Sequence, residues 1–175
     1  MKAAMNKPVR KSPEIIGWRE NVSLPELGLQ RLAAKIDTGA RTSALHAVNQ
    51  RIVMRDDVQC VEFTIPVGNR RSTNIVFAPL VGEREIKNSS GVSERRLVVY
   101  TSLVMGRHRW RIEVSLTNRE RMEYDIIIGR TAIRKRGILV DPGRSFLLDP
   151  VQPKSEYGEH GAFPIEIGQL KGRTL

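Results

Sequence analysis

The sequence predicts a mostly β fold, a barrel of strands with one short helix. Short runs of apolar and β-branched residues recur along the chain, and polar turns separate them. One stretch, residues 131–137, has the Thr-first and Gly-last pattern of a short helix. The sequence contains no internal repeat, no low-complexity tract and no heptad pattern.

Composition and charge narrow the class of protein. A chain of 175 residues is long enough for one domain with its own core. Its formal net charge of +10 favours anionic partners: nucleic acid, acidic protein segments or membrane headgroups. Cys60 is the single cysteine, so no disulfide can form within the chain and a reducing compartment is expected. Because the sequence has no apolar signal region and no run of about 18 apolar residues, we expect a cytoplasmic protein without membrane contact.

The first half of the chain predicts strands joined by tight turns. Residues 1–13 are basic and contain two prolines, so we expect a flexible leader. A first strand is expected at residues 14–22. Pro25 and Gly28 mark a turn before a second strand, which ends at Ile36. Further extended segments are expected at residues 42–48, 58–67 and 74–81.

Two hairpins are expected in the second half. Residues 85–100 place a polar Asn-Ser-Ser-Gly centre between two runs with strand character, which is typical of a long hairpin. Residues 101–105 and 109–116 are expected to form the next one. From Trp110 to Leu116 apolar residues alternate with charged or polar ones, which predicts a strand with one buried face.

The last elements surround the helix. Residues 124–130 predict a buried strand that ends at Gly129, and the helix at 131–137 follows at once. A final hairpin is expected at residues 138–148. From Asp149 onward Pro, Gly and charged residues become frequent, which predicts an irregular tail over residues 149–175.

The stretch Lys-Ile-Asp-Thr-Gly-Ala-Arg-Thr-Ser, residues 35–43, presents the residue best suited to catalysis. It places the Asp37 carboxylate on a sharp turn directly after an apolar strand. Gly39 allows the backbone to turn back, and the Thr38 hydroxyl can hold the turn by hydrogen bonds to the backbone. Asp37 is therefore the candidate catalytic residue, in a turn formed with Thr38, Gly39 and Ala40.

The Asp-Thr-Gly-Ala turn resembles the active-site turn of retropepsins, the retroviral-type aspartic peptidases. The string at residues 35–47 resembles, more specifically, a bacterial family first labelled ATP-dependent zinc proteases and now regarded as retropepsin-like. Members of that family trim glutamate tails that an ATP-grasp ligase adds to ribosomal protein S6. The resemblance spans most of residues 14–148 and is strongest at 35–47, 85–99 and 122–131. It implies a retropepsin-like closed β-barrel with a flap hairpin and one short helix, with residues 14–148 as the peptidase domain.

Catalysis by this chain requires a second carboxylate. Aspartic peptidases use two carboxylates that share one proton across a bound water. The chain contains one Asp-Thr-Gly; its nearest counterpart, Asp141-Pro142-Gly143, lacks both the hydroxyl and one backbone donor. We therefore expect a symmetric homodimer with one Asp37 from each chain at the two-fold axis. The resemblance implies that Thr38 of each chain hydrogen-bonds across this axis.

The resemblance also implies where substrate lies. The hairpin at residues 85–100 would be the flap that closes over substrate, and residues 126–130 would pack under the active-site turn. Basic side chains near the flap and the turn would offset the repulsion between an acidic tail and the ionised Asp37. Candidate substrate-binding residues are Arg41, Ser43, Lys87, Ser89, Ser90, Gly91 and Arg95, with Arg96 beside them. The expected substrate is a glutamate-tailed protein, with ribosomal protein S6 and its ligase as candidate partners.

Metal and nucleotide sites find little support in the sequence. His46, His108 and His160 are far apart, and there is no His-Glu-x-x-His, no Cys pair and no Gly-x-x-x-x-Gly-Lys-Ser/Thr. We therefore expect no metal and no cofactor. His46 follows the turn closely and either tunes it or has a structural role. Lys35 stands where viral enzymes have an apolar residue, so their substrate pockets are not transferred to this chain.

A non-catalytic binding module of the same fold is the alternative. The charge of +10 favours a module that docks acidic tails or RNA. However, most aromatic residues lie within apolar strands rather than among basic loop residues, so stacking platforms for single strands are not evident. An intact Asp-Thr-Gly favours catalysis, because a binder has no need for converging carboxylates.

Overall fold

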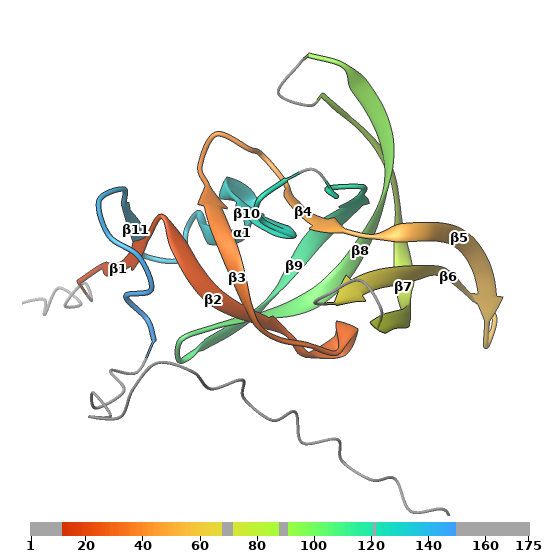
Figure 1. Ribbon diagram of the computed structural model, residues 1–175, viewed down its shortest axis with the longest axis horizontal. Coiled ribbons are helices and arrows are strands. Elements are labelled where there is room, and N and C mark those ends of the chain that lie inside the picture. The colour runs from red at the N-terminus through yellow and green to blue at the C-terminus, as the bar shows by residue number, and fades with distance from the viewer. Residues whose placement is uncertain (1–11, 68–71, 88–90, 121, 150–175) are drawn as a thin grey trace, which may run out of the picture.

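The structure, a computed structural model, describes residues 12–67, 72–87, 91–120 and 122–149 (Figure 1). The strands are β1 (Glu14–Gly17), β2 (Arg19–Leu24), β3 (Leu29–Asp37), β4 (Ser43–His46), β5 (Val48–Arg55), β6 (Val58–Val67), β7 (Ser72–Lys87), β8 (Ser93–Met105), β9 (His108–Thr117), β10 (Ile126–Gly129) and β11 (Ile138–Asp141). A 3-10 turn, η1 (Pro25–Leu27), and one short helix, α1 (Arg130–Ile133), complete the described elements. None of the helices in this part of the chain has the length and apolar character needed to cross a membrane.

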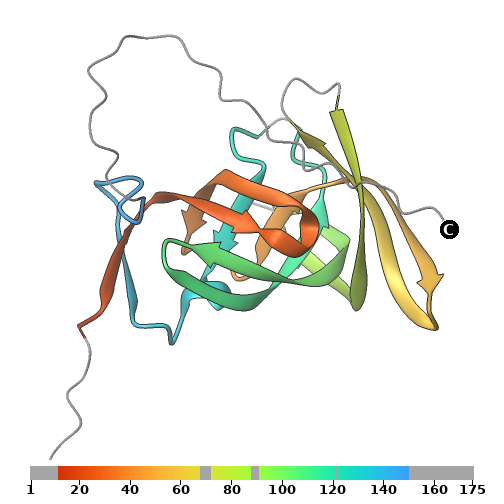
Figure 2. The same ribbon diagram turned by 90° about the horizontal axis from the view of Figure 1, so that it is seen from below.

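Six strands form a closed barrel. They pair in the order β2-β3-β10-β4-β9-β8, and the pairing of β2 with β8, with Val22 opposite Met105, closes the ring. The sheet continues beyond β8 through β7 and β6 to β5. Seen from below, this extension and the small β1–β11 sheet lie at opposite ends of the barrel (Figure 2). The predicted mostly β fold, with a closed barrel and one short α-helix, is confirmed.

The barrel interior is apolar. Leu24, Leu45, Leu103 and Ile126 are all fully buried. Along β9 the predicted alternation holds at first, but every residue from Val114 to Thr117 is buried. This half of β9 is paired on both edges, with β8 and with β4.

The N-terminal strand differs from the prediction. Residues 14–22 form two strands, because the chain breaks at Trp18 and its N–H donates to the carbonyl of Arg144 (2.9 Å). β1 thereby leaves the barrel and pairs in parallel with β11. The hairpin predicted at residues 138–148 is wrong: β11 takes β1 as its partner, and residues 142–149 form turns rather than a returning strand. The sequence reading also missed β5.

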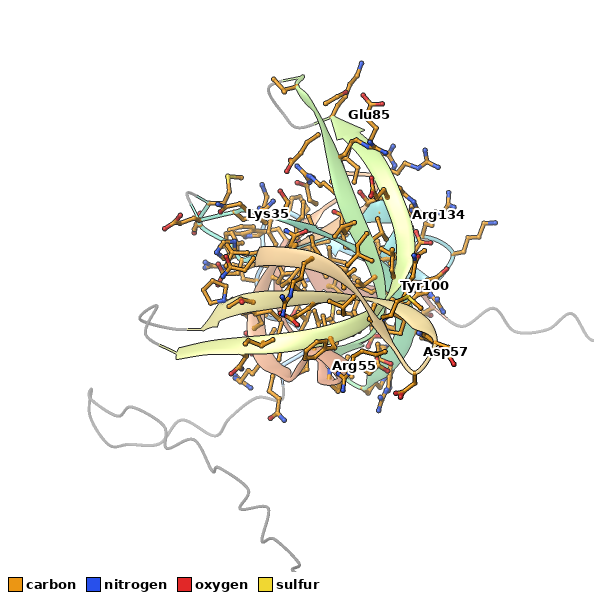
Figure 3. The ribbon with its side chains drawn as sticks, turned by 90° about the vertical axis from the view of Figure 1, so that its right-hand side faces the viewer. Lys35, Arg55, Asp57, Glu85, Tyr100 and Arg134 are labelled. Atoms are coloured by element: carbon orange, nitrogen blue, oxygen red, sulfur yellow. The ribbon has the colours of Figure 1, made fainter. Side chains whose placement is uncertain are left out.

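The long hairpin of β7 and β8 is confirmed by their register, which pairs Leu80 with Val99 and Lys87 with Ser93. It projects away from the barrel, and Glu85 marks its outer part in Figure 3. Gly82 stands at a register shift, where β7 contains one extra residue and bends. Gly91, just after the tip, has a φ of +79°, which favours glycine. The tip, with Ser89 and Ser90, lies outside the described residues, as do most of the predicted leader and of the predicted tail.

Candidate active site

The Asp37 carboxylate closes its own turn at the end of β3. Its Oδ1 accepts hydrogen bonds from the N–H of Gly39 (3.1 Å) and of Ala40 (3.0 Å). Within the described part of the chain, Oδ2 accepts none and stays available. We expected the Thr38 hydroxyl to hold the turn. Instead Thr38 is exposed, and among the described residues its one partner is the Arg130 guanidinium, which donates to the Thr38 carbonyl.

β10 supports this turn from beneath. It runs parallel to β3 with Gly129 opposite Asp37, and it also pairs with β4. A Cβ added at Gly129 would lie 2.4 Å from the carbonyl carbon of Thr42, so only glycine fits. The N–H of Arg130 donates to the carbonyl of Ala40 (2.9 Å). This is the arrangement that the resemblance implied for residues 126–130, and it fixes the position of the carboxylate.

Ser43 requires a correction. We expected its side chain to contact substrate, but it is fully buried. Its hydroxyl accepts a hydrogen bond from the N–H of Gly129 (3.1 Å), and its carbonyl accepts one from the Ser115 hydroxyl (3.0 Å). Ser43 thus ties β4 to β10 and β9, and this burial leaves it no surface for a ligand.

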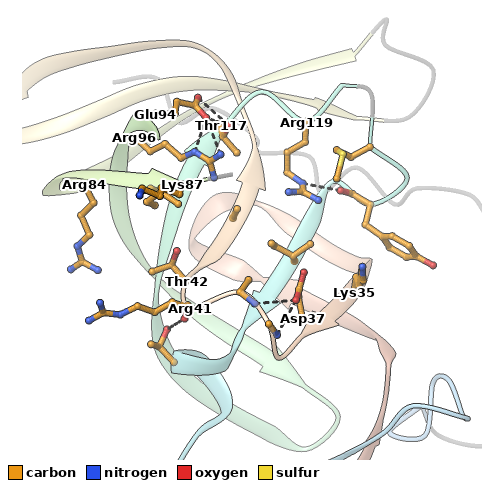
Figure 4. Close-up of a pocket in the computed structure, with 18 of the residues that line it drawn as sticks. Lys35, Asp37, Arg41, Thr42, Arg84, Lys87, Glu94, Arg96, Thr117 and Arg119 are labelled. Atoms are coloured by element: carbon orange, nitrogen blue, oxygen red, sulfur yellow. Dashed lines mark hydrogen bonds and ion pairs between the residues drawn. The ribbon is translucent and has the colours of Figure 1, made fainter. Parts of the chain in front are cut away.

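A pocket of about 1320 Å³ opens over the turn (Figure 4). Its walls come from the Asp37 turn, the projecting hairpin and the segment after β9. Seven cationic residues line it: Lys35, Arg41, Arg84, Lys87, Arg96, Arg119 and Arg134. Five carboxylates also line it: Asp37, Glu85, Glu94, Glu113 and Glu123. The excess of positive charge favours an anionic ligand.

Two of these cations are already neutralised. Arg84 forms a two-pronged ion pair with Glu113, and the Nη2 to Oε1 distance is 2.8 Å. The hydrogen bond from Arg84 is the main reason that the pKa of Glu113 lies below its usual value. Arg96 pairs with Glu94 at 2.8 Å, and Glu94 also accepts from the Thr117 hydroxyl (3.3 Å). Ligand binding therefore depends chiefly on the remaining cations.

The other predicted residues divide between pocket and surface. Arg41 and Lys87 line the pocket with exposed side chains. Gly91 lies beside the hairpin tip, which is not described. Arg95, expected to bind substrate, does not line the pocket and pairs with Glu83 at 3.1 Å.

Arg119 is a pocket residue that the sequence reading missed. Its backbone N–H donates to Nδ1 of His46 (2.9 Å), and its Nε donates to the carbonyl of Tyr124 (3.1 Å). His46 is buried, so its role in this conformation is to position this segment. Burial is the main cause that lowers the pKa of Arg119; the neighbouring charge of Arg96 adds to it, while Asp37 and Asp125 oppose it. Arg119 stands in a polar loop, and no local motif distinguishes it from other surface arginines.

Comparisons with known proteins agree with this geometry. A family model described as retropepsin-like aspartic endopeptidase RimB matches residues 15–150. A Parasynechococcus marenigrum protein named probable alpha-L-glutamate ligase is 42% identical over 136 residues, which are 77% of this chain and 29% of that protein. A Shewanella pealeana protein of the same name is 38% identical over 160 residues, 90% of this chain and 32% of its own length. The chain thus spans about a third of these curated relatives.

A solved structure is also similar. A Legionella pneumophila protein of unknown function aligns with a TM-score of 0.68 and 32% identity. The alignment covers 79% of this chain and all of that one.

Proposed function

Because this chain belongs to the RimB-like family, whose model is described as a retropepsin-like aspartic endopeptidase, we propose that it hydrolyses peptide bonds as a homodimer. The observation that supports the proposal most is the Asp37 turn. Its carboxylate is fixed through Oδ1 by two backbone N–H groups, lines a large pocket and rests on the backbone at Gly129. A carboxylate held in this way can present its free oxygen to a water molecule.

The proposed mechanism uses one Asp37 from each protomer. Two carboxylates about 3 Å apart cannot both ionise, so the pair holds one proton between them. The ionised carboxylate removes a proton from the bound water, and the resulting nucleophile attacks the scissile carbonyl carbon. The protonated carboxylic acid donates its proton to the carbonyl oxygen as the tetrahedral intermediate forms. The carboxyl group that took the proton from water then gives it to the amide nitrogen. A hydroxyl of the intermediate returns its proton to the other carboxylate as the C–N bond breaks, so the amine leaves and the pair again holds one proton.

A glutamate-rich tail is the proposed substrate, on ribosomal protein S6 or a similar protein. The excess of cations around the pocket supports an acidic ligand. The names of the relatives support the same class: a probable alpha-L-glutamate ligase would add the residues that a peptidase removes. The flap role of the β7–β8 hairpin, with Lys87 at its described end, also belongs to this proposal.

The test is mass spectrometry of a protein with a poly-glutamate tail after incubation with wild type or Asp37→Asn. Wild type should shorten the tail, and Asp37→Asn should leave it intact, because a neutral amide cannot accept the water proton. Asp141→Asn is the matched control: Asp141 also accepts a hydrogen bond from the glycine two residues on (2.8 Å), but it does not line the pocket. Full activity of Asp37→Asn would contradict the mechanism.

A non-catalytic module that docks acidic tails or RNA is the second candidate, supported by the net charge of +10. It predicts that wild type and Asp37→Asn bind such a ligand without cleaving it, with an affinity that falls steeply as salt rises. Absence of tail shortening together with this binding would favour the module over the peptidase.

A further inference from the structure

Arg119 differs from every other cation among the described residues of the pocket. Arg84 and Arg96 are paired with Glu113 and Glu94. The rest, Lys35, Arg41, Lys87 and Arg134, have exposed side chains that keep their hydration and mobility. Arg119 is partly buried, and in the described part of the chain no carboxylate lies within ion-pair distance of it. It is therefore a guanidinium that has lost part of its hydration without gaining a counter-ion.

The backbone around Arg119 holds it in place. Its backbone N–H donates to Nδ1 of His46, and the backbone N–H of His46 donates to the carbonyl of Asp125 (2.7 Å). Its Nε donates to the carbonyl of Tyr124, which fixes one edge of the guanidinium. A guanidinium carries five N–H donors, and the terminal nitrogens hydrogen-bond to none of the described residues. They remain available to a ligand.

The neighbouring charges define what this ligand should be. Figure 4 shows Arg119 near Arg96 and Asp37, and the charges of both residues act on the Arg119 guanidinium. Burial and the charge of Arg96 both disfavour the charged form of Arg119. An anion bound at the terminal nitrogens of Arg119 would offset this cost, and a carboxylate matches the two-pronged geometry of arginine.

We propose that Arg119 binds a carboxylate of the substrate beside the scissile bond and selects acidic substrates. This inference rests on the proposed peptidase function. It assigns the selectivity to one residue that the family resemblance did not indicate. The carboxylate belongs either to a glutamate side chain or to the free end of the tail. His46 is a positioning residue, which acts through the backbone of Arg119.

Binding can be measured apart from cleavage. The Asp37→Asn full-length chain is titrated with a fluorescent oligo-glutamate peptide near physiological ionic strength, where long-range attraction is screened. Two further peptides separate the sources of the carboxylate: one with an amidated C-terminus, and one with glutamine at every position but a free C-terminus. Arg119→Gln should weaken binding of the acidic peptide about tenfold, the expected loss for one charge-assisted hydrogen-bonded contact.

The controls address charge and folding. Arg95→Gln removes the same charge from an exposed side chain that pairs with Glu83 and does not line the pocket, so it should change affinity less than about twofold. Arg119→Lys keeps the positive charge but loses the planar pair of N–H donors. Its affinity for the acidic peptide should therefore lie between that of the chain with Arg119 and that of Arg119→Gln. Thermal unfolding of each variant shows whether it folds. His46→Asn, whose Oδ1 can replace Nδ1 as acceptor, should keep the preference for glutamate over glutamine, whereas His46→Phe should lose it.

Each outcome decides the matter. If Arg119→Gln weakens the binding only of peptides that have glutamate side chains, the bound group is a side-chain carboxylate. If it weakens the binding of every peptide with a free C-terminus and leaves the binding of the amidated peptide unchanged, the bound group is the C-terminal carboxylate of the tail. Equal losses for Arg119→Gln and Arg95→Gln, or no loss for either, would overturn the proposal. Selective binding without cleavage by wild type would refute the peptidase and leave this carboxylate site standing.

Discussion

Asp37 and Gly129 are register partners in the parallel pairing of β3 and β10. The N–H of Gly129 donates to the Ser43 hydroxyl, and the glycine leaves no room for a side chain above Thr42. The candidate catalytic carboxylate and the backbone that supports it therefore belong to one close-packed unit.

Gly129→Ala should break this unit. Its Cβ would stand 2.4 Å from backbone at Thr42, and backbone cannot move aside as the end of a flexible side chain can. We expect a loss of about 3 kcal/mol in the free energy of unfolding, at the upper end for overpacking, together with loss of cleavage. Gly143→Ala is the control, because its Cβ meets only the Asp141 side chain at 3.3 Å. Denaturant titration measures the free energy of unfolding of both variants. An unchanged denaturation midpoint for Gly129→Ala would contradict the packing argument.

Subunit mixing tests whether two Asp37 residues act together. An equal mixture of wild type and Asp37→Asn, after exchange of subunits, contains about one quarter wild-type dimers. Cleavage should fall to about a quarter of that given by the same total amount of wild type. A fall to only one half would mean that each protomer works alone. Mixing with Asp141→Asn supplies the control and should leave the rate unchanged.

Cleavage should not depend on a metal ion. A mechanism based on two carboxylates uses protons and water alone, so EDTA should leave the rate of tail shortening within about twofold of the untreated protein. The measurement is the same mass-spectrometric assay after dialysis against the chelator. Full loss of activity that added zinc restores would revive a metallopeptidase mechanism.

Acid should destabilise the fold partly through Glu26. Hydrogen bonds from the side chain and the backbone N–H of Ser102 lower the pKa of Glu26 below its usual value of 4.5. Because the folded-state pKa is the lower one, this stabilisation is complete above pH 4.5 and disappears as pH falls through the folded value. Glu26→Gln should therefore flatten the acid limb of a plot of unfolding free energy against pH.

Ser102→Ala offers a second approach to the same pair. It removes the side-chain donor and leaves the backbone donor, so the acid limb should become shallower than in wild type but steeper than in Glu26→Gln. An acid limb identical in all three proteins would show that this pair does not contribute.

The parts that the sequence predicted are those with local signals. An Asp-Thr-Gly turn and a polar hairpin centre each depend on a few adjacent residues, and the structure has the turn at Asp37 and the β7–β8 hairpin. The helix predicted at residues 131–137 is present as α1, but it ends at Ile133, and Gly129 rather than Thr131 is its N-cap. The substrate role expected for Ser43 failed because burial depends on strands that arrive from elsewhere in the chain.

The parts that the sequence could not predict are contacts between distant segments. The hydrogen bond between His46 and Arg119 joins residues 73 positions apart, and neither residue belongs to a motif that names the other. The pairing of β1 with β11 could not be predicted for the same reason. The sequence of neither strand shows whether it forms a local hairpin or pairs in parallel with a distant strand.

The position of β10 between β3 and β4 has a consequence for biosynthesis. β3 and β4 are neighbours in sequence, but β10, at residues 126–129, separates them in the barrel. A nascent chain that ends before β10 has a gap in the barrel wall directly beneath the Asp37 turn. Long-range closure of this kind is the slow part of β-barrel folding. The carboxylate is synthesised early yet gains its support late, so a partly synthesised chain lacks the supported Asp37 turn.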